Sequence, residues 1–326
     1  MNMGKYILRR FAGIIPLLFG ISLLSFAVIN LAPGKPGALE NSLNPRISAR
    51  ALERLEKLYE LDKPVYERYW HWLKRTAVLD FGRSFSDNRP VIEKIAERLP
   101  VTITINLLSL FLIFAAAIPL GVRCALRPDG ILDKVMTAAM FFLFAIPTFW
   151  LALLLMNFFG INLRWLPVSG ITSLNYEYLS PAGKAVDIFR HLFLPVTVSS
   201  LGGIAAMARY MRSSMIEALA QPYIRMARAK GLTERSVLYK HAFRNAVMPL
   251  ITIMGLSLPG LVGGSVIFES VFAIPGAGRL FYEAVMMRDY PLIMAEVVIV
   301  SLLTMTANLL ADLSYAWIDP RLRDKR

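Results

Sequence analysis

Long apolar runs separated by polar segments dominate the hydropathy pattern of this chain. Four runs contain no Asp, Glu, Lys or Arg, and they cover residues 11–32, 100–122, 135–163 and 245–268. Each meets or exceeds the about 20 residues that an α-helix needs to cross a bilayer core. Two further runs are weaker, because 191–208 is short unless its helix continues to Met215, and 290–311 contains Glu296. The pattern predicts an all-α polytopic membrane protein with six transmembrane helices.

Composition supports this class. The apolar fraction of 56% and the mean hydropathy of +0.51 exceed what is usual for soluble proteins, which have about 45–50% apolar residues. The first apolar run is longer than the about 7–15 residues of a signal-peptide core, and no Ala-x-Ala site follows it, so we expect a permanent helix. The single Cys124 excludes an intrachain disulfide and is expected at the inner end of the second helix as a reduced thiol.

The distribution of basic residues predicts the orientation. If the N-terminus is cytoplasmic, the segments on the inner side carry 18 Lys and Arg residues and the short outer loops carry five. The remaining 13 lie in the long segment 33–98, which the positive-inside rule discounts because long loops cross the membrane largely regardless of charge. We therefore expect both termini on the cytoplasmic side of the inner membrane.

The net charge of +13 also has to be weighed as a sign of nucleic-acid binding. Half of the basic residues lie beside predicted membrane helices, where topology and anionic lipid explain them. No basic motif with interleaved aromatic residues is present. We expect a lipid bilayer, and no nucleic acid, as the partner of these charges.

The segment 33–98 is predicted to be a small external helical cap. Ser48 can cap a helix in which Leu52, Leu55 and Leu58 recur at helical spacing. Pro64 and Pro90 each suit a first helical turn, with helices expected over 65–78 and 91–99. Such a cap is either a docking surface for an external partner or a packed lid with no binding role.

No catalytic, metal or cofactor motif stands out. The three histidines are scattered, and His-Glu-x-x-His, Gly-x-Ser-x-Gly and paired cysteines are all missing from the sequence. The Gly-x-x-x-x-Gly-Lys-Ser/Thr phosphate loop is missing as well. We expect no cofactor and no enzymatic activity, and any work driven by ATP must then be done by another polypeptide.

The polar, basic segment 216–245 lies between two of the apolar runs, so it should sit at a membrane face. Pro222 can begin a short helix, Gly231 can end it with φ > 0, and Thr233 can cap the next helix. Ala227 and Ala229 keep the short helix slim enough to enter a groove, where Tyr223, Ile224 and Met226 would give apolar contacts. The alternative is an amphipathic helix on anionic lipid, held by Arg225, Arg228 and Lys230.

This segment resembles the signature loop of ABC importer permeases, and more closely that of the dipeptide, oligopeptide and nickel permease family. The matching pieces are Tyr223-Ile224-Arg225, Ala227-Arg228-Ala229-Lys230-Gly231-Leu232, His241-Ala242 and Arg244-Asn245-Ala246. The general signature has an acidic residue where this chain has Arg225, a departure usual in the peptide branch. The resemblance extends from Tyr6-Ile-Leu-Arg-Arg10 to Asp319-Pro-Arg-Leu-Arg323.

The resemblance implies a type I ABC importer permease fold with an external cap after the first helix. It makes the short helix a coupling helix that enters a cleft of an ATPase subunit. It also implies three kinds of partner, namely a homologous second permease, two cytoplasmic ATPases and an external substrate-binding protein. The residues assigned to ATPase coupling are Glu217, Pro222, Tyr223, Ile224, Arg225, Ala227, Arg228, Ala229, Gly231, His241, Arg244 and Asn245.

Two carboxylates and a glycine-rich loop are candidates for the transport pathway. Carboxylates at membrane depth usually face a bundle interior or a water-filled cavity, which draws attention to Glu269 and Glu296. Residues 271–279 and 288–291 resemble loop motifs of the same permeases. The possible pathway or gate residues are Glu269, Pro275, Gly276, Gly278 and Glu296.

Small residues are expected to let helices approach closely, at Gly260 and Gly264 in the fifth span and at Ser199, Gly203 and Ala206 in the fourth. Packing within the chain and lining of a pore remain open for both sets. Pro249 and Pro259 add possible bends.

We expect four regions: 1–32 with the first helix, 33–98 outside, 99–316 as the permease core, and a basic tail at 317–326. The function implied by the resemblance is import of short peptides. The sequence leaves open a nickel-chelate or glutathione permease of the same family, a secondary transporter, and a structural or assembly membrane protein. A secondary transporter would be expected to show repeat symmetry with broken helices in both halves.

Overall fold

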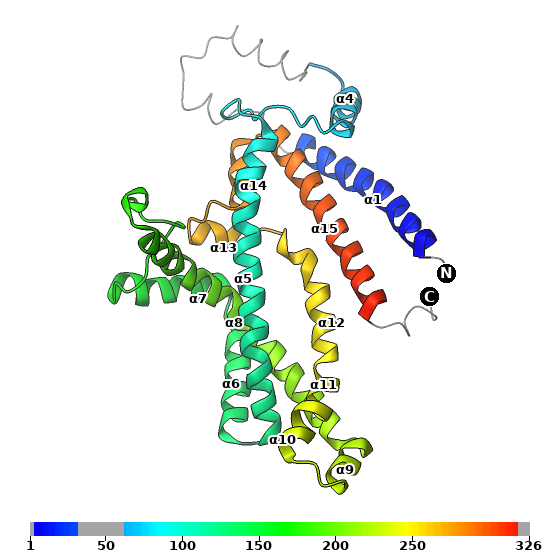
Figure 1. Ribbon diagram of the computed structural model, residues 1–326. Helices are drawn as coiled ribbons and strands as arrows, with labels where there is room; N and C mark the ends of the chain where they lie inside the picture. Colours follow the sequence, from blue (N-terminus) through cyan, green and yellow to red (C-terminus); the bar gives the residue numbers. More distant parts are fainter. Residues whose placement is uncertain (1–2, 32–61, 319–326) are drawn as a thin grey trace.

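Helices form all the named elements in the described part of the chain, residues 3–31 and 62–318 of a computed structural model. Four of them are long and apolar enough to cross a membrane, and two bent helix pairs raise the number of candidate spans to six. The long helices are α1 (Met3–Leu31), α5 (Val91–Leu126), α8 (Pro181–Ala220) and α15 (Tyr290–Ile318). Figure 1 shows α5 as the long axis of the molecule, with α1 and α15 side by side. The expected all-α polytopic architecture is confirmed.

The pair α5 and α8 forms the centre of the molecule. A Cβ atom on Gly121 of α5 would lie 2.5 Å from the Ala208 carbonyl oxygen of α8, and one on Gly203 would lie 2.5 Å from the Ile113 side chain. The hydroxyl groups of Ser109 and Ser199 are 2.5 Å apart across the same interface. The small residues expected in the fourth span thus serve close helix packing within the chain.

The third span differs from the single helix expected over 135–163. The chain forms α6 (Ile131–Ala145), then α7 (Thr148–Leu155) with a π-helical end (Met156–Asn162), and the two halves meet at 104°. Ile146 is extended, with ψ 127°, as the steric demand of the following Pro147 favours. In Figure 1, α7 projects sideways from the α5–α8 pair.

The fifth span is shorter than expected. A helical stretch, Glu234–Ala246, continues at 40° as Met248–Leu261, with Pro249 in the first turn of α12 (Met248–Ser257). The prediction that it continues to 268 is wrong, because the chain leaves the helix after Leu261 and starts α13 (Val266–Val271). Gly260 and Gly264 are therefore not on one helix face. Gly264 instead lies against Gly278, at the start of α14 (Ala277–Met287).

The helices expected in the segment 33–98 are confirmed in part. The helix expected over 65–78 is α4 (Val65–Ala77), and its Tyr69 hydroxyl lies 2.9 Å from that of Ser22 in α1. The helix expected over 91–99 is not separate, since α5 starts at Val91 and continues through Pro100. A membrane helix tolerates such a proline where neighbouring elements compensate the lost bond. The helix expected after Ser48 lies outside the described residues.

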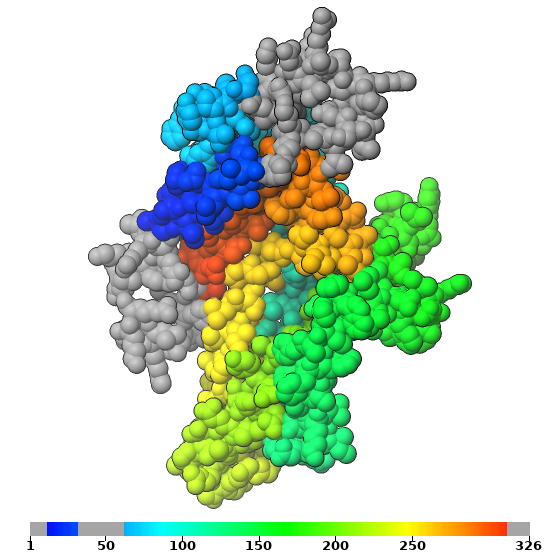
Figure 2. Space-filling view, turned by 180° about the vertical axis from the view of Figure 1, so that it is seen from behind, coloured from blue at the N-terminus to red at the C-terminus, as the bar shows by residue number. Residues whose placement is uncertain are grey.

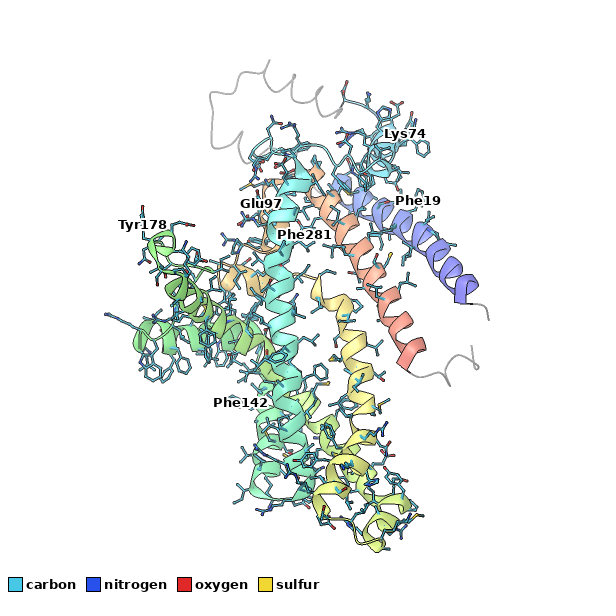
Figure 3. The ribbon with its side chains drawn as sticks, in the orientation of Figure 1. Phe19, Lys74, Glu97, Phe142, Tyr178 and Phe281 are labelled. Carbon is cyan, nitrogen blue, oxygen red and sulfur yellow. The ribbon has the colours of Figure 1, made fainter. Side chains whose placement is uncertain are left out.

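Large apolar side chains lie on the outside of the spans. Ile15, Leu24 and Val28 of α1 are 72%, 68% and 66% exposed. Phe142 of α6 is 64% exposed and points away from the α5–α8 pair (Figure 3). Contiguous exposure of this kind is unusual for a soluble monomer, whereas lipid would cover it.

Candidate coupling segment and outer carboxylate site

The turn geometry predicted for the basic segment is confirmed. Helix α9 (Pro222–Ala229) has Pro222 in its first turn, and Gly231 follows with φ +75°. The Gly231 amide donates to the Arg228 carbonyl, with an N···O distance of 2.9 Å. Thr233 then caps the next helix by accepting from the Ser236 amide at 3.4 Å. Glycine suits this point because a side chain at positive φ is strained.

The faces of α9 differ from the expectation for docking. Ile224 and Ala227 are buried at 0% and 6% exposure, and they pack into the chain's own core with Val237 and Ala242. Their spacing of three residues places them on one helix face. The prediction that these two enter a partner's groove is therefore wrong. Tyr223, Arg225, Met226, Arg228 and Ala229 lie on the exposed surface.

The second half of the segment holds α9 in place. After α10 (Glu234–Ser236) the chain forms a π-helix (Val237–Ala242) and then α11 (Phe243–Ala246). The Asn245 amide donates to the Tyr223 hydroxyl oxygen at 3.0 Å, and Arg228 pairs with Glu234 at 2.9 Å across the turn. The ion pair is exposed and therefore contributes little to stability.

The remaining coupling candidates lie at the same end of the molecule. His241 is partly buried, whereas Glu217, at the end of α8, and Arg244 are exposed. Figure 2 shows α6 and the chain from the end of α8 through α11 gathered at this end, in green and yellow-green. The structure thus brings the predicted coupling residues together.

An ion pair that the sequence analysis missed joins two of these elements. The Arg212 guanidinium of α8 reaches both carboxylate oxygens of Asp133 of α6, at 2.6 and 2.7 Å. The Asp133 side chain is 6% exposed. The two residues are far apart in sequence. The available signal was the short turn between α5 and α6, which brings Asp133 back alongside α5 and so close to α8, the partner of α5. The pair fixes α6 to the helix that leads into α9.

Glu269 organises the chain between α13 and the start of α14. Its carboxylate accepts hydrogen bonds from the Thr102 hydroxyl at 2.8 Å and from the Arg279 amide at 2.9 Å. The Thr102 oxygen in turn accepts from the Ala277 amide at 2.8 Å. Two free N–H groups at the start of α14 are thereby satisfied, as helix N-termini require. Gly276 lies directly against the carboxylate and has no room for a side chain.

Glu296 is buried in α15 at 3% exposure. Its Oε2 atom has no hydrogen-bond partner in the part of the chain that the structure describes. An unsatisfied carboxylate at membrane depth is costly. Pro275 lies in the loop before α14, and Gly278 lies in the first turn of α14. This group contacts the first half of α5 through Thr102, whereas α9 shares a core cluster with Val122 and Ala125 near the end of α5.

Asp289, a second residue that sequence reasoning missed as a site, joins the external segment to the last span. It is 1% exposed, accepts from the Phe85 amide at 3.0 Å and from the Ser84 hydroxyl, and lies beside the start of α15. Its position in the motif 288–291 was the available signal. Asp289 anchors the loop 80–90 to the start of α15.

The family models and the relatives that match this chain all describe the same family of transport proteins. Residues 117–324 match the family model described as "Binding-protein-dependent transport system inner membrane component", and residues 3–106 match the model of its N-terminal region. The oligopeptide transport system permease protein AppB of Bacillus subtilis is 42% identical over 98% of this chain and 99% of its own length. The glutathione transport system permease protein GsiC of Escherichia coli K12 is 35% identical over 99% and 100%. A probable peptide ABC transporter permease protein of Sinorhizobium fredii is 36% identical over 98% and 100%.

The bundle of apolar helices with a polar segment at one end defines a multi-pass membrane component of a transport system. The chain belongs to the family of binding-protein-dependent transport system inner membrane components. It is a permease subunit of an ABC importer, and such a permease works in a complex with other subunits.

Proposed function

We propose that this chain forms half of a membrane pathway that imports short peptides delivered by an external binding protein. Two cytoplasmic ATPases and a homologous second permease complete the transporter. The observation that carries the proposal is α9, which is fixed on the chain's own core by Ile224 and Ala227 and turns Tyr223, Arg225 and Met226 outward. A rigid helix with an exposed mixed apolar and basic face suits docking to a soluble partner.

The coupling role follows from what α9 is attached to. Its buried face packs on a cluster that includes Met211 and Met215 of α8 and Leu250 of α12. A push on α9 therefore reaches two membrane helices through close-packed side chains, which transmit strain well. ATP would be bound and hydrolysed by the partner ATPases, and α9 of this chain would transmit their movement to the membrane helices.

The similarity to AppB supports oligopeptides as the substrate class. Glutathione, itself a small peptide, is the second candidate, and the relative GsiC favours it. A nickel chelate remains the third candidate from the sequence. With both termini cytoplasmic, as the charge distribution indicates, α9 faces the ATPases and the Glu269 loop faces outward.

Reconstitution tests the proposal. The chain alone should neither bind nor hydrolyse ATP. Co-expressed with its neighbouring ATPases and second permease, it should be recovered with both. Addition of binding protein loaded with a tetrapeptide should then raise ATP hydrolysis and peptide uptake into vesicles. Uptake driven by an ion gradient in vesicles that contain only this chain would overturn the proposal and favour a secondary transporter.

A further inference from the structure

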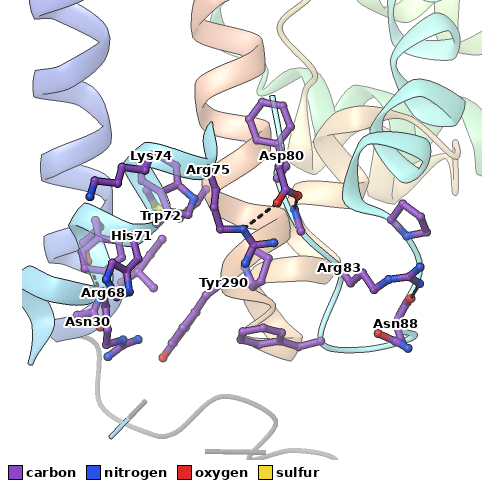
Figure 4. A pocket seen from close by; sticks show the side chains of 18 residues that line it. Asn30, Arg68, His71, Trp72, Lys74, Arg75, Asp80, Arg83, Asn88 and Tyr290 are labelled. Carbon is purple, nitrogen blue, oxygen red and sulfur yellow. Dashed lines mark hydrogen bonds and ion pairs between the residues drawn. The ribbon is translucent and has the colours of Figure 1, made fainter. Parts of the chain in front are cut away.

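A cavity of about 880 Å³ lies between α1, α4, the loop 80–90 and the start of α15 (Figure 4). Its volume is within the range of about 300–1,000 Å³ that small-molecule sites occupy. None of the coupling residues, and neither Glu269 nor Glu296, lines it. The cavity is therefore separate from the sites described above.

The lining of the cavity is strongly basic. Arg68, Lys74, Arg75 and Arg83 line it, and among the lining side chains of the described residues Asp80 is the one acidic residue. Arg75 pairs with Asp80 at 2.9 Å, and this hydrogen bond holds the pKa of the Asp80 carboxyl below its usual value. The pair is thus neutral overall and leaves three positive charges uncompensated.

These three cations form no ion pair with an acidic residue within 3–31 and 62–318. Lys74 Nζ lies 5.3 Å from the centre of the Trp70 ring, and Arg83 donates to the Asn88 carbonyl at 2.7 Å. Arg68 is partly buried, and desolvation lowers the pKa of its guanidinium because burial disfavours the charged form. The three cations line the cavity from two sides, Arg68 and Lys74 from α4 and Arg83 from the loop 80–90 (Figure 4), and an anion between them would offset their positive potential.

The other part of the lining is apolar. Phe26 and Ile29 of α1, Phe81 of the loop and Met294 of α15 contribute to it. A small inorganic anion would leave this surface in contact with water. A molecule with an anionic head and a hydrocarbon body fits both parts.

The side chains of α4 are of the kind found at a bilayer surface. Tyr69 packs against Phe26 of α1, with ring centres 5.2 Å apart, so α4 lies alongside that helix. The outer face of α4 exposes Tyr66 and Trp70, at 72% and 54%, and these two residue types concentrate at the headgroup level of membranes. Val28 of α1, 66% exposed, lies within the apolar surface below.

We propose that this cavity binds the phosphate group of an anionic phospholipid, such as phosphatidylglycerol. Arg68 and Lys74 of α4 contact the headgroup from one side of the cavity and Arg83 of the loop 80–90 from the other, and an acyl chain lies along the apolar residues of α1. The proposal rests on membrane insertion of the chain and needs neither the substrate nor the ATPase partners of the proposed function. With the orientation given above, the lipid belongs to the outer leaflet.

Lipid binding is measured on the purified full-length chain, alone and in the assembled transporter, in mild detergent, by titration with fluorescent phosphatidylglycerol and by native mass spectrometry. We expect saturable binding of phosphatidylglycerol and much weaker binding of phosphatidylcholine. Arg68→Gln/Arg83→Gln should weaken it by about tenfold or more, since each lost charge-assisted contact is worth that much. Arg127→Gln, which removes an exposed cation at the other end of α5, is the matched control and should bind normally.

Lys74→Gln provides a second variant if the double variant does not assemble, because Lys74 is exposed and outside the core. Undiminished binding in either assembled variant overturns the proposal, as does equal affinity for phosphatidylcholine. Displacement of the lipid by millimolar inorganic phosphate would show instead that the site takes a free anion. Because binding is read without ATP or peptide, failure here leaves the transport proposal intact, and loss of transport alone leaves the lipid site intact.

Discussion

The side-chain amide of Asn245 donates a hydrogen bond of 3.0 Å to the Tyr223 hydroxyl oxygen, and this bond fastens the first turn of α9 to α11. Asn245 also donates to the His241 carbonyl at 3.1 Å, so its amide is held in place by its own helix. This bond between two exposed side chains therefore adds to the buried contacts of Ile224 and Ala227 in setting the angle of α9 relative to the fifth span.

Removal of this bond should loosen the coupling and leave the fold intact. Asn245→Ala and Tyr223→Phe should each lower the stimulation of ATP hydrolysis by loaded binding protein by up to about fivefold, as expected from a loss near 1 kcal/mol. The double variant should be no worse than either single one, because both remove the same interaction. Additive losses would mean that the two residues act independently.

Gly231→Val should impair transport through backbone strain alone. A Cβ atom at this position would meet nothing within 4 Å, but φ is +75°, and a left-handed conformation costs about 1–2 kcal/mol for a residue with a side chain. Uptake should fall while membrane insertion persists. Gly231→Asn should be milder, since Asn tolerates this region. Gly202→Ala, at an equally open position inside α8, is the control, and normal uptake by Gly231→Val would refute the turn argument.

Ala227→Trp and Ala229→Trp should fail in different ways. Ala227 is buried in the core, so a large side chain there should destabilise the chain by about 1–3 kcal/mol or more through overpacking. Ala229 is exposed on α9, and tryptophan there should leave the thermal stability of the chain unchanged while it weakens recovery of the ATPases. Equal recovery of the ATPases with Ala229→Trp and with the unaltered chain would place docking elsewhere.

Substitution of the two buried carboxylates should distinguish a structural role from a role in the transport pathway. Glu269→Gln weakens charge-assisted bonds to the Thr102 hydroxyl and the Arg279 amide and should lower stability by about 2 kcal/mol. Glu296→Gln should not destabilise the chain, because Oε2 of Glu296 lacks a partner among the described residues. A drop in uptake with unchanged stability would assign Glu296 to the pathway. Unchanged uptake would show that transport does not need this carboxylate.

The orientation can be checked by thiol labelling. Cys124 is 3% exposed and cannot report on either side, so the tests use a Cys124→Ser background. Asp87→Cys, at a side chain 40% exposed, should label with an impermeant reagent in intact cells. Arg235→Cys, exposed beyond the Gly231 turn, should label only after the membrane is opened. The reverse pattern would invert the topology.

Local rules sufficed for the parts of the fold that depend on short stretches of sequence. The presence of the apolar spans and the roles of Pro222, Gly231 and Thr233 were predictable because hydropathy, the missing proline N–H and positive φ act within a few residues. The orientation of α9 was not. Ile224 and Ala227 turn inward because the end of α8 and the π-helix Val237–Ala242 pack against α9, and only the tertiary arrangement decides this.

The breaks within spans escaped prediction for a related reason. Hydropathy in 135–163 is continuous and does not distinguish a straight helix from one bent by 104° after Ile146. The available signal was Pro147, which disfavours a helical conformation at Ile146. The role of Glu269 was equally hidden, because its partner Thr102 lies 167 residues away in sequence. Glu269 was singled out because a carboxylate is costly in lipid. In the structure this carboxylate accepts hydrogen bonds from α5 and from the start of α14.

The glycines around Glu269 have a practical consequence for mutational mapping of this permease. Gly264, Gly276 and Gly278 each lack space for even one methyl group, because backbone or carboxylate atoms occupy the place of the Cβ. Alanine scanning treats a methyl group as the mildest perturbation. Here it would rank these three positions among the most sensitive in the chain, so sensitivity at this loop measures steric fit and identifies no contact with the cargo.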